Sequence, residues 1–198
     1  MGAPSLIGLT GGIAAGKSEA LRAFERLGAE TISTDEVVRE LLRTPEVRAR
    51  LVARWGEEIA RDGEVDRAKV AEIVFESPEE LTWLESELHP LVGARVVEWA
   101  GGLSADATIA VVEVPLLFES GMDELFDAVV SVVAPDELRQ ERERGRDLTG
   151  LEGRAGRQLS QDEKAARATH VVTNDGSLAD LEARIRELVA ELESGQGT

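Results

Sequence analysis

The stretch Gly11-Gly12-Ile13-Ala14-Ala15-Gly16-Lys17-Ser18 decides how this sequence is interpreted. It fits the pattern G-x-x-x-x-G-K-S/T at every specified position. The apolar segment 5–10 before it predicts a strand, and the amphipathic segment 17–27 after it predicts a helix that ends at Gly28. A glycine-rich turn that binds nothing would account for the glycines, but not for the lysine and the hydroxyl that follow. In this setting the motif predicts a phosphate-binding loop.

The residue types of the motif explain how it would hold a nucleoside triphosphate. Its glycines let backbone N–H groups turn toward phosphate oxygens, and the following helix adds the positive end of its dipole. Lys17 is expected to reach the β- and γ-phosphates as a point charge. The Ser18 hydroxyl is expected to ligate Mg²⁺, which prefers oxygen ligands. The sequence thus predicts a site for ATP and Mg²⁺ over Gly11, Gly12, Ile13, Ala14, Ala15, Gly16, Lys17 and Ser18.

Composition argues against several other classes of protein. The 198 residues suffice for one compact domain, and the net charge of −17 argues against a nucleic-acid partner, which would need clustered Lys and Arg. No apolar run approaches the ~20 residues that span a bilayer, and the first residues lack a secretory signal. We therefore expect a cytoplasmic protein without a membrane partner. The absence of cysteine removes thiolate catalysis and disulfides.

Apolar runs alternate with amphipathic segments along the chain. We expect strands at 5–10, 30–33, 109–114, 128–133 and 170–173. We expect helices at 17–27, 35–43, 45–55, 67–75, 78–88, 90–100, 135–144, 161–168 and 178–192. This alternation predicts an α/β fold, a P-loop kinase-type parallel five-stranded sheet flanked by helices. The interval 35–100 holds helices and no convincing strand, so we expect a helical insertion beside the carboxyl ends of the strands.

One segment is rich in arginine although the chain is acidic. The interval 139–157 holds six arginines against four acids, which fits either an exposed helix of alternating charges or a lid over phosphates. The short chain and the helical insertion favour a metabolite kinase with such a lid. The expected parts of the single domain are a core (1–34 and 105–198), an acceptor-binding insertion (about 35–100) and a lid (about 139–160). A GTPase is not indicated, because neither Lys69 nor Lys164 lies in an N/T-K-x-D sequence.

Asp35 follows the second predicted strand, whose end faces the phosphate site in this kind of fold. Its carboxylate could accept the proton of an acceptor hydroxyl and help to hold Mg²⁺ through water. Alternatively, Ser33 and Glu36 form a capping box, and Asp35 merely favours the helix dipole. The spacing alone favours neither interpretation. Glu113 ends another strand at the position of a metal-orienting acid, for which glutamate is a weaker candidate than aspartate.

Further motifs accompany the loop in a fixed order. They are Gly8-Leu9-Thr10-Gly11-Gly12-Ile13, Asp35, His89-Pro90-Leu91, Val114-Pro115-Leu116-Leu117-Phe118-Glu119, Arg142-x-x-x-Arg146-Asp147, Gln158, Glu163-Lys164 and Val171-Val172-x-Asn174-x-Gly176. Over about residues 6–190 the sequence resembles the dephospho-coenzyme A kinase family. The combination of these motifs is much more specific than a phosphate-binding loop.

The resemblance implies the last step of coenzyme A synthesis, in which ATP phosphorylates the ribose 3′-hydroxyl of dephospho-coenzyme A. Asp35 matches the family's catalytic carboxylate, and Thr10 matches a position near the reacting phosphates. The insertion corresponds to the region that holds the acceptor. Candidate acceptor contacts are His89, Pro115 and Leu116, although the histidine could instead mark a helix start and the other two could belong to the core. In the lid, Arg142 and Arg146 match positions against adenine and the phosphates.

The sequence also departs from the family pattern. Ser33 stands where an aspartate is usual, Ala14 and Ala15 replace a common Gly-Ser pair, and Glu19 stands where threonine is frequent. The Glu19 carboxylate, at the edge of the nucleotide site, either opposes phosphate or points away. The segment 148–157 is about three residues shorter than usual, and its glycines indicate a flexible lid.

Two other classes of protein stay open at this point. One is a kinase for a different metabolite, such as a nucleoside or a nucleotide, and the other is a nucleotide-binding switch without catalysis. Assays with a panel of acceptors separate them. We expect a monomer, although the sequence does not settle the oligomeric state.

Overall fold

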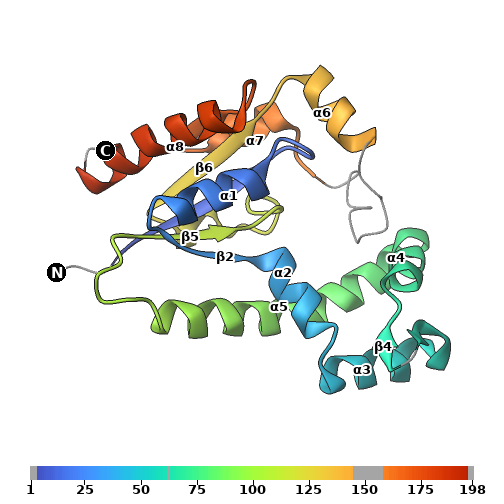
Figure 1. The fold of residues 1–198 in the computed structure, drawn as a ribbon. Helices are drawn as coiled ribbons and strands as arrows, with labels where there is room; N and C mark the ends of the chain where they lie inside the picture. The colour runs from blue at the N-terminus through green and yellow to red at the C-terminus, as the bar shows by residue number, and fades with distance from the viewer. Residues whose placement is uncertain (1–3, 62, 145–157, 196–198) are drawn as a thin grey trace.

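Five parallel strands form the central sheet (Figure 1). The computed structural model describes residues 4–61, 63–144 and 158–195. Across the sheet, the strands are β2 (Glu30–Ser33), β5 (Ile109–Glu113), β1 (Ser5–Gly11), β6 (Ala128–Val133) and β7 (His170–Thr173). The nearly continuous apolar runs of β5 and β6 are typical of strands that are buried on both faces. The predicted α/β fold with a five-stranded parallel sheet is confirmed.

The register of the strands brings the carboxyl ends of β1, β2 and β5 to one edge of the sheet. Leu9 of β1 and Ser33 of β2 both pair with Glu113 of β5. On the other side of β1, Gly11 pairs with Val132. The segments that follow these strands therefore leave the sheet together, at the edge where open α/β sheets bind their ligands.

Helices cover both faces of the sheet. On one face α1 (Lys17–Arg26) packs beside α8 (Leu178–Glu193), and Phe24 and Ile185 are completely buried there. The C-terminal half of α5 (Pro78–Gly101) contributes Trp99 to a cluster on the other face. The remaining helices of this part are η2 (Asp123–Leu125), α6 (Asp136–Arg144) and α7 (Gln161–Arg167).

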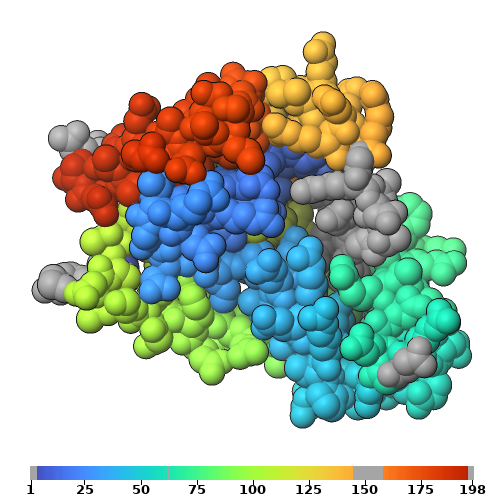
Figure 2. All heavy atoms as spheres, in the orientation of Figure 1, coloured from blue at the N-terminus to red at the C-terminus, as the bar shows by residue number. Residues whose placement is uncertain are grey.

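A second hydrophobic cluster fills the insertion between β2 and β5. Besides α5, the insertion contains α2 (Thr34–Leu41), α3 (Pro45–Trp55), η1 (Glu57–Ile59) and α4 (Arg67–Glu76). Leu51, Ile59 and Val70 are completely buried in it, and the rings of Trp55 and Trp83 meet edge to face with their centroids 5.1 Å apart. In Figure 2 these helices, coloured from sky blue to green, form the lower part of the molecule, beneath α1 and α8.

The structure differs from the expected elements at two places in the insertion. β3 (Ala60–Arg61) and β4 (Glu64–Val65) form an antiparallel hairpin that is too short to leave an alternating pattern in the sequence. The helices predicted at 78–88 and 90–100 are one helix, α5, which continues through Pro90. The proline removes a backbone hydrogen bond, but the two halves of the helix pack into separate hydrophobic clusters, which stabilise it as one rod.

Two further observations concern the predicted lid and the ends of the helices. Most of the lid, including Arg146, lies outside the described residues, which stop at Arg144 and resume at Gln158. A capping box starts α8, since Ser177 and Asp180 exchange side-chain and backbone hydrogen bonds. Among the helices of the described ranges, none combines the length and the apolar character that a membrane span requires.

Candidate active site

The loop between β1 and α1 is held in place by the far end of the chain. The side-chain amide of Asn174, which is buried just after β7, donates to the carbonyl of Ala15 at 2.8 Å. Gly16, the N-cap of α1, has a left-handed φ of 100°. A Cβ atom at Gly16 would lie 2.1 Å from Nδ2 of Asn174, so only glycine combines this backbone with that contact.

Two cationic side chains lie against this loop. The Lys17 ammonium donates to the carbonyls of Gly11 at 3.2 Å and Gly12 at 3.0 Å, so it lies across the first turn of the loop. From α6, Nη1 of Arg142 lies 3.4 Å from the carbonyl oxygen of Ala14. The structure therefore brings the predicted phosphate-binding lysine and one predicted lid arginine to the same loop.

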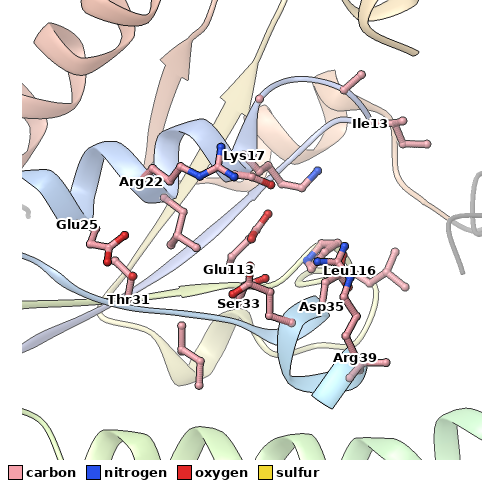
Figure 3. A pocket seen from close by; sticks show the side chains of 18 of the residues that line it. Ile13, Lys17, Arg22, Glu25, Thr31, Ser33, Asp35, Arg39, Glu113 and Leu116 are labelled. Atoms are coloured by element: carbon pink, nitrogen blue, oxygen red, sulfur yellow. The ribbon is translucent and has the colours of Figure 1, made fainter. Parts of the chain in front are cut away.

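A cavity of about 440 Å³ opens between the loop and the insertion (Figure 3). Its lining combines the loop residues Ile13, Ala14, Gly16, Lys17 and Ser18 with Ser33, Asp35, Glu113, Pro115 and Leu116. In Figure 3, Lys17 lies on one side and Asp35 on the other, with the Glu113 carboxylate between them. The structure thus gathers phosphate-binding and acceptor-binding candidates from three strand ends around one space.

Several predicted site residues do not line the cavity. Gly11, Gly12 and Ala15 belong to the loop, and Arg142 lies against it. Thr10 is completely buried behind the loop, where its hydroxyl donates to the carbonyl of Pro115 at 3.3 Å. The Glu19 carboxylate pairs with Arg22 on the surface of α1 and does not line the cavity. His89 is exposed in the middle of α5, away from the cavity lining, and it does not mark a helix start because α5 begins at Pro78.

The Ser33 side chain interacts with Glu113 and does not cap α2. Both residues are 5% exposed, and the Ser33 hydroxyl hydrogen-bonds to the Glu113 carboxylate. The side chain of Ser33 makes no capping bond, so the alternative interpretation of Ser33 and Glu36 as a capping box is wrong. Burial raises the pKa of Glu113 above its ordinary value, although the bond from Ser33 and the charge of Lys17 oppose that rise.

The raised pKa of Glu113 predicts a pH dependence of stability. A carboxyl that holds its proton more tightly in the folded chain favours folding at low pH. That contribution is lost as the pH rises from the ordinary value of about 4.3 through the raised pKa. Glu113→Gln, which cannot ionise, should therefore gain stability over the wild type as the pH approaches neutrality. Urea unfolding at a series of pH values measures this, with Glu40→Gln as an exposed control; a constant difference across the series contradicts the prediction.

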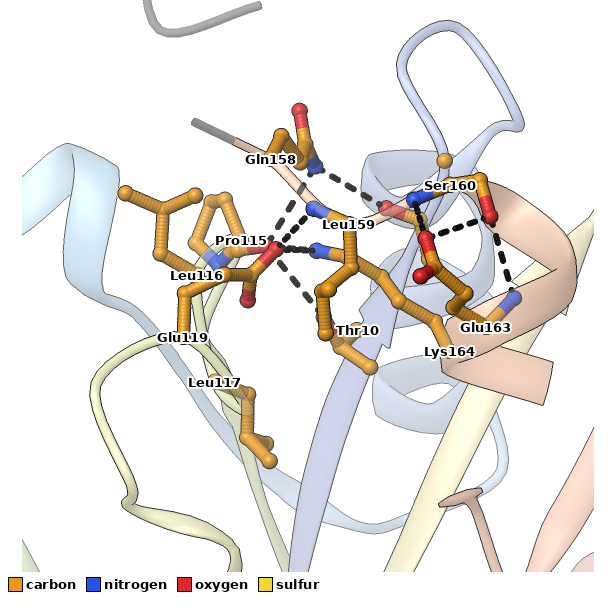
Figure 4. Close-up of polar contacts among 12 residues, drawn as sticks. Thr10, Pro115, Leu116, Leu117, Glu119, Gln158, Leu159, Ser160, Glu163 and Lys164 are labelled. Carbon is orange, nitrogen blue, oxygen red and sulfur yellow. Dashed lines mark hydrogen bonds and ion pairs between the residues drawn. The ribbon is translucent and has the colours of Figure 1, made fainter. Parts of the chain in front are cut away.

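A buried cluster beside the cavity ties three distant segments together (Figure 4). Lys164 of α7 is completely buried, and its ammonium binds the Pro115 carbonyl and, at 3.0 Å, Oε1 of Glu119. The same Glu119 oxygen accepts the backbone N–H of Leu159 at 2.8 Å. Gln158 extends the cluster, since its Nε2 lies 3.4 Å from the Pro115 carbonyl and 3.5 Å from the Gly11 carbonyl. The end of β1, the segment after β5 and the segment before α7 are thus joined.

This cluster was not predicted as part of the site. The resemblance includes Glu119, Gln158, Lys164 and Asn174 among its motifs, but nothing in their spacing indicates that they meet beside the phosphate-binding loop. Burial lowers the pKa of Lys164, while the hydrogen bond to Glu119 acts against that shift. The hydrogen bond from Lys164 fixes the Pro115 carbonyl, which borders the cavity.

Lys164→Met should destabilise the protein by about 1–3 kcal/mol, because it leaves the buried Glu119 carboxylate and the Pro115 carbonyl with fewer donors. The double variant Lys164→Met/Glu119→Leu should recover part of that loss, since it removes the orphaned charge as well. Urea unfolding measures both, with Lys69→Met as the exposed control. A single variant as stable as this control would show that the pair contributes nothing.

Comparison with known proteins shows the family of this chain. The dephospho-CoA kinase family model matches residues 5–180. A dephospho-CoA kinase of Streptomyces avermitilis is 40% identical over 191 residues, which cover 94% of this chain and 93% of the relative. Another, from Protochlamydia amoebophila, is 35% identical over 193 residues, covering 94% of this chain and 95% of the relative.

Solved structures extend the agreement to three dimensions. A Thermus thermophilus protein superposes with a TM-score of 0.78 at 34% identity, covering 96% of this chain and 99% of the other. Dephospho-CoA kinase from Campylobacter jejuni has a TM-score of 0.70 at 28% identity, with 96% and 98% covered. A shikimate kinase from Bacteroides thetaiotaomicron, at 16% identity and a TM-score of 0.54, shares the fold alone. A phosphate-binding loop in this fold, together with the family match over most of the chain, shows that the protein is a kinase that belongs to the dephospho-CoA kinase family.

Proposed function

We propose that the protein transfers the γ-phosphoryl group of ATP to the ribose 3′-hydroxyl of dephospho-coenzyme A, which yields coenzyme A and ADP. One observation carries this proposal. A single cavity is bounded by Lys17 and Ser18 of the phosphate-binding loop on one side and by Asp35 on the other. Phosphoryl transfer requires such an arrangement, because donor phosphate and acceptor hydroxyl must meet in line.

In the proposed reaction the loop binds the donor. Backbone N–H groups of Gly11–Gly16 surround the phosphates, and Lys17 neutralises charge on the β- and γ-phosphates. Asp35 accepts the proton of the 3′-hydroxyl as its oxygen bonds to the γ-phosphorus, while the bond from that phosphorus to the β,γ-bridging oxygen breaks and ADP leaves. Arg142, and Arg146 of the lid, neutralise charge on the nucleotide as the lid closes.

The oxygen donors of the cavity fit a magnesium ion. The Ser18 hydroxyl and the carboxylates of Asp35 and Glu113 line the same space. Mg²⁺ prefers oxygen ligands, keeps several of its waters and takes others from substrate phosphates, so a site with few protein ligands suits it. We propose that Ser18 is the direct ligand and that Asp35 acts through water. When bound, the ion neutralises charge on the phosphates of ATP.

We also propose the division of labour within the chain. The insertion, about 35–100, binds the acceptor with Pro115 and Leu116 at its border, and the lid, about 139–160, closes over the nucleotide. We further propose that the protein is a monomer that acts in the cytoplasm on small molecules and not on nucleic acid. Light scattering after size-exclusion chromatography tests the monomer, and a mass of two chains contradicts it.

A coupled assay of ADP release tests the proposed reaction. We expect ADP release with ATP and Mg²⁺ only when dephospho-coenzyme A is present, and we expect the product to carry a 3′-phosphate. Shikimate, nucleosides and nucleotides serve as competing acceptors in the same assay. Faster turnover with one of them would indicate a different metabolite kinase. ATP binding without release of ADP under any of these conditions would indicate a nucleotide-binding switch.

A further inference from the structure

Two arginines of the cavity lining have no acidic partner among the described residues. The cavity is lined by Arg22, Arg39 and Arg67, and only Arg22 is paired, with Glu19. This is notable in a chain with 39 acids and 22 basic residues, where many arginines of the described ranges lie against a carboxylate. Those paired arginines are Arg26, Arg50, Arg54, Arg95, Arg139, Arg184 and Arg186. The charges of Arg39 and Arg67 are therefore available to a ligand.

The helix α2 aligns Arg39 with the proposed catalytic base. Arg39 follows Asp35 by four residues, so the two lie one helical turn apart on the same face, with about 5–6 Å between their Cβ atoms. Both line the cavity, and Figure 3 shows both near Leu116. Arg39 is exposed, so a ligand that enters the cavity can reach its guanidinium.

Arg67 is positioned by the turn that follows the β3–β4 hairpin. The backbone N–H of Asp66 donates to the carbonyl of Ile59 at 2.7 Å, and the Asp66 carboxylate caps α4 by accepting from Ala68 and Lys69. These bonds fix Arg67 as the first residue of α4. Its Nε is buried and has no hydrogen-bond partner within the described ranges. Burying a donor without a partner is unfavourable, and a ligand or water that accepts its hydrogen bond removes that cost.

We propose that Arg39 and Arg67 bind the diphosphate group of the acceptor, an inference that rests on the proposed function. In an adenosine 5′-diphosphate unit, the ribose carries its 3′-hydroxyl on one side of the ring and its 5′-phosphate on the other. When the hydroxyl lies at Asp35, the diphosphate lies about one ring away, a separation similar to one helical turn. Guanidinium groups bind phosphate oxygens through paired hydrogen bonds, which suits them to this role.

This assignment gives the two arginines a part in selecting the acceptor. Asp35 recognises a hydroxyl, which many metabolites carry. Arg39, one helical turn from Asp35, and Arg67, which lines the same cavity, add a requirement for a diphosphate next to that hydroxyl. Four carboxylates of the cavity repel anions that the arginines do not bind. Glu25, Asp35, Glu36 and Glu113 are these carboxylates.

Arg39→Met, Arg67→Met and the double variant test the proposal, with Arg43→Met as the control. Arg43 is exposed just after α2 and lies outside the cavity lining. Its substitution removes the same charge from the same part of the chain. Each single variant should raise the KM for dephospho-coenzyme A roughly 10- to 100-fold, as expected for hydrogen bonds to a charged group. The kcat and the KM for ATP should stay within about twofold of the control, since neither arginine touches the reacting atoms. Thermal unfolding checks that the variants fold.

Three outcomes separate this proposal from the proposed function. A KM for dephospho-coenzyme A equal to that of Arg43→Met overturns the role of the arginines, and an equal rise in the KM for ATP reassigns them to the donor. A wild-type protein that does not phosphorylate dephospho-coenzyme A contradicts the proposed function instead. In that case calorimetry decides about the arginines. Weaker binding of dephospho-coenzyme A by the variants than by wild type and Arg43→Met supports their role, and equal or absent binding overturns it.

Discussion

Lys17→Ala is expected to reduce kcat by roughly 10³-fold, to the background of the assay, with little change in stability. Lys17 places an ammonium within the phosphate-binding loop, where the negative charge of the transferred group develops, and loss of one such electrostatic contact typically costs 10²–10³-fold in turnover. The side chain is only half-buried, and it donates hydrogen bonds to the loop carbonyls of Gly11 and Gly12. The loss of two such hydrogen bonds from a half-buried side chain should change stability little.

The matched control for this prediction is Arg26→Ala. Arg26 lies on the same helix, is exposed, pairs with Glu182 and is absent from the cavity lining, so its removal changes the net charge equally. The coupled ADP assay should separate the two variants by orders of magnitude, while thermal unfolding should find both close to wild type. Turnover of Lys17→Ala within tenfold of the Arg26→Ala control would exclude the loop as the phosphate site.

Asp35→Asn should lower kcat roughly 10²-fold or more, the usual contribution of a general base. Asparagine keeps the shape of the side chain and its place in the first turn of α2, but it cannot accept the proton of the acceptor hydroxyl. The KM for ATP should change little, because the phosphates are bound by the loop. Steady-state kinetics with Glu40→Gln, a neutralised carboxylate on the exposed side of α2, provides the comparison. Undiminished turnover in Asp35→Asn removes this residue from the base role.

The sequence predicted β5 and β6 well because these strands are buried on both faces. Such strands appear in the sequence as short apolar runs, which are recognisable without knowledge of distant residues, as at 109–114 and 128–133. The prediction of two separate helices was wrong at Pro90, where a proline locally favours a break in the helix. Tertiary packing decided the outcome there, since the two halves of α5 are held by different clusters, and packing between distant segments leaves no local signal.

Only the parts of the site that are encoded by residues close together in the sequence could be predicted. The loop from Gly11 to Ser18 is recognisable because residue type and distance along the chain express its chemistry directly. Spacing did not decide between the two interpretations of Asp35, whose proposed role comes from the family resemblance. Arg39 lies four residues after Asp35 in a predicted helix, and this spacing could have identified it as a site residue. Arg67 carried none, because its place depends on a hairpin of two-residue strands. The Lys164–Glu119 pair joins segments that only the folded chain brings together.

The hydrogen bond from Asn174 to Ala15 has a consequence for folding of the enzyme during its synthesis. The two residues are separated by 159 positions, so the loop obtains this anchor only after Asn174 has been translated. Contacts between such remote parts form late and slowly, after local helices and turns. A growing polypeptide on the ribosome therefore holds an incomplete nucleotide pocket. We expect a chain cut short before β7 to retain helical content but to have lost tight affinity for ATP.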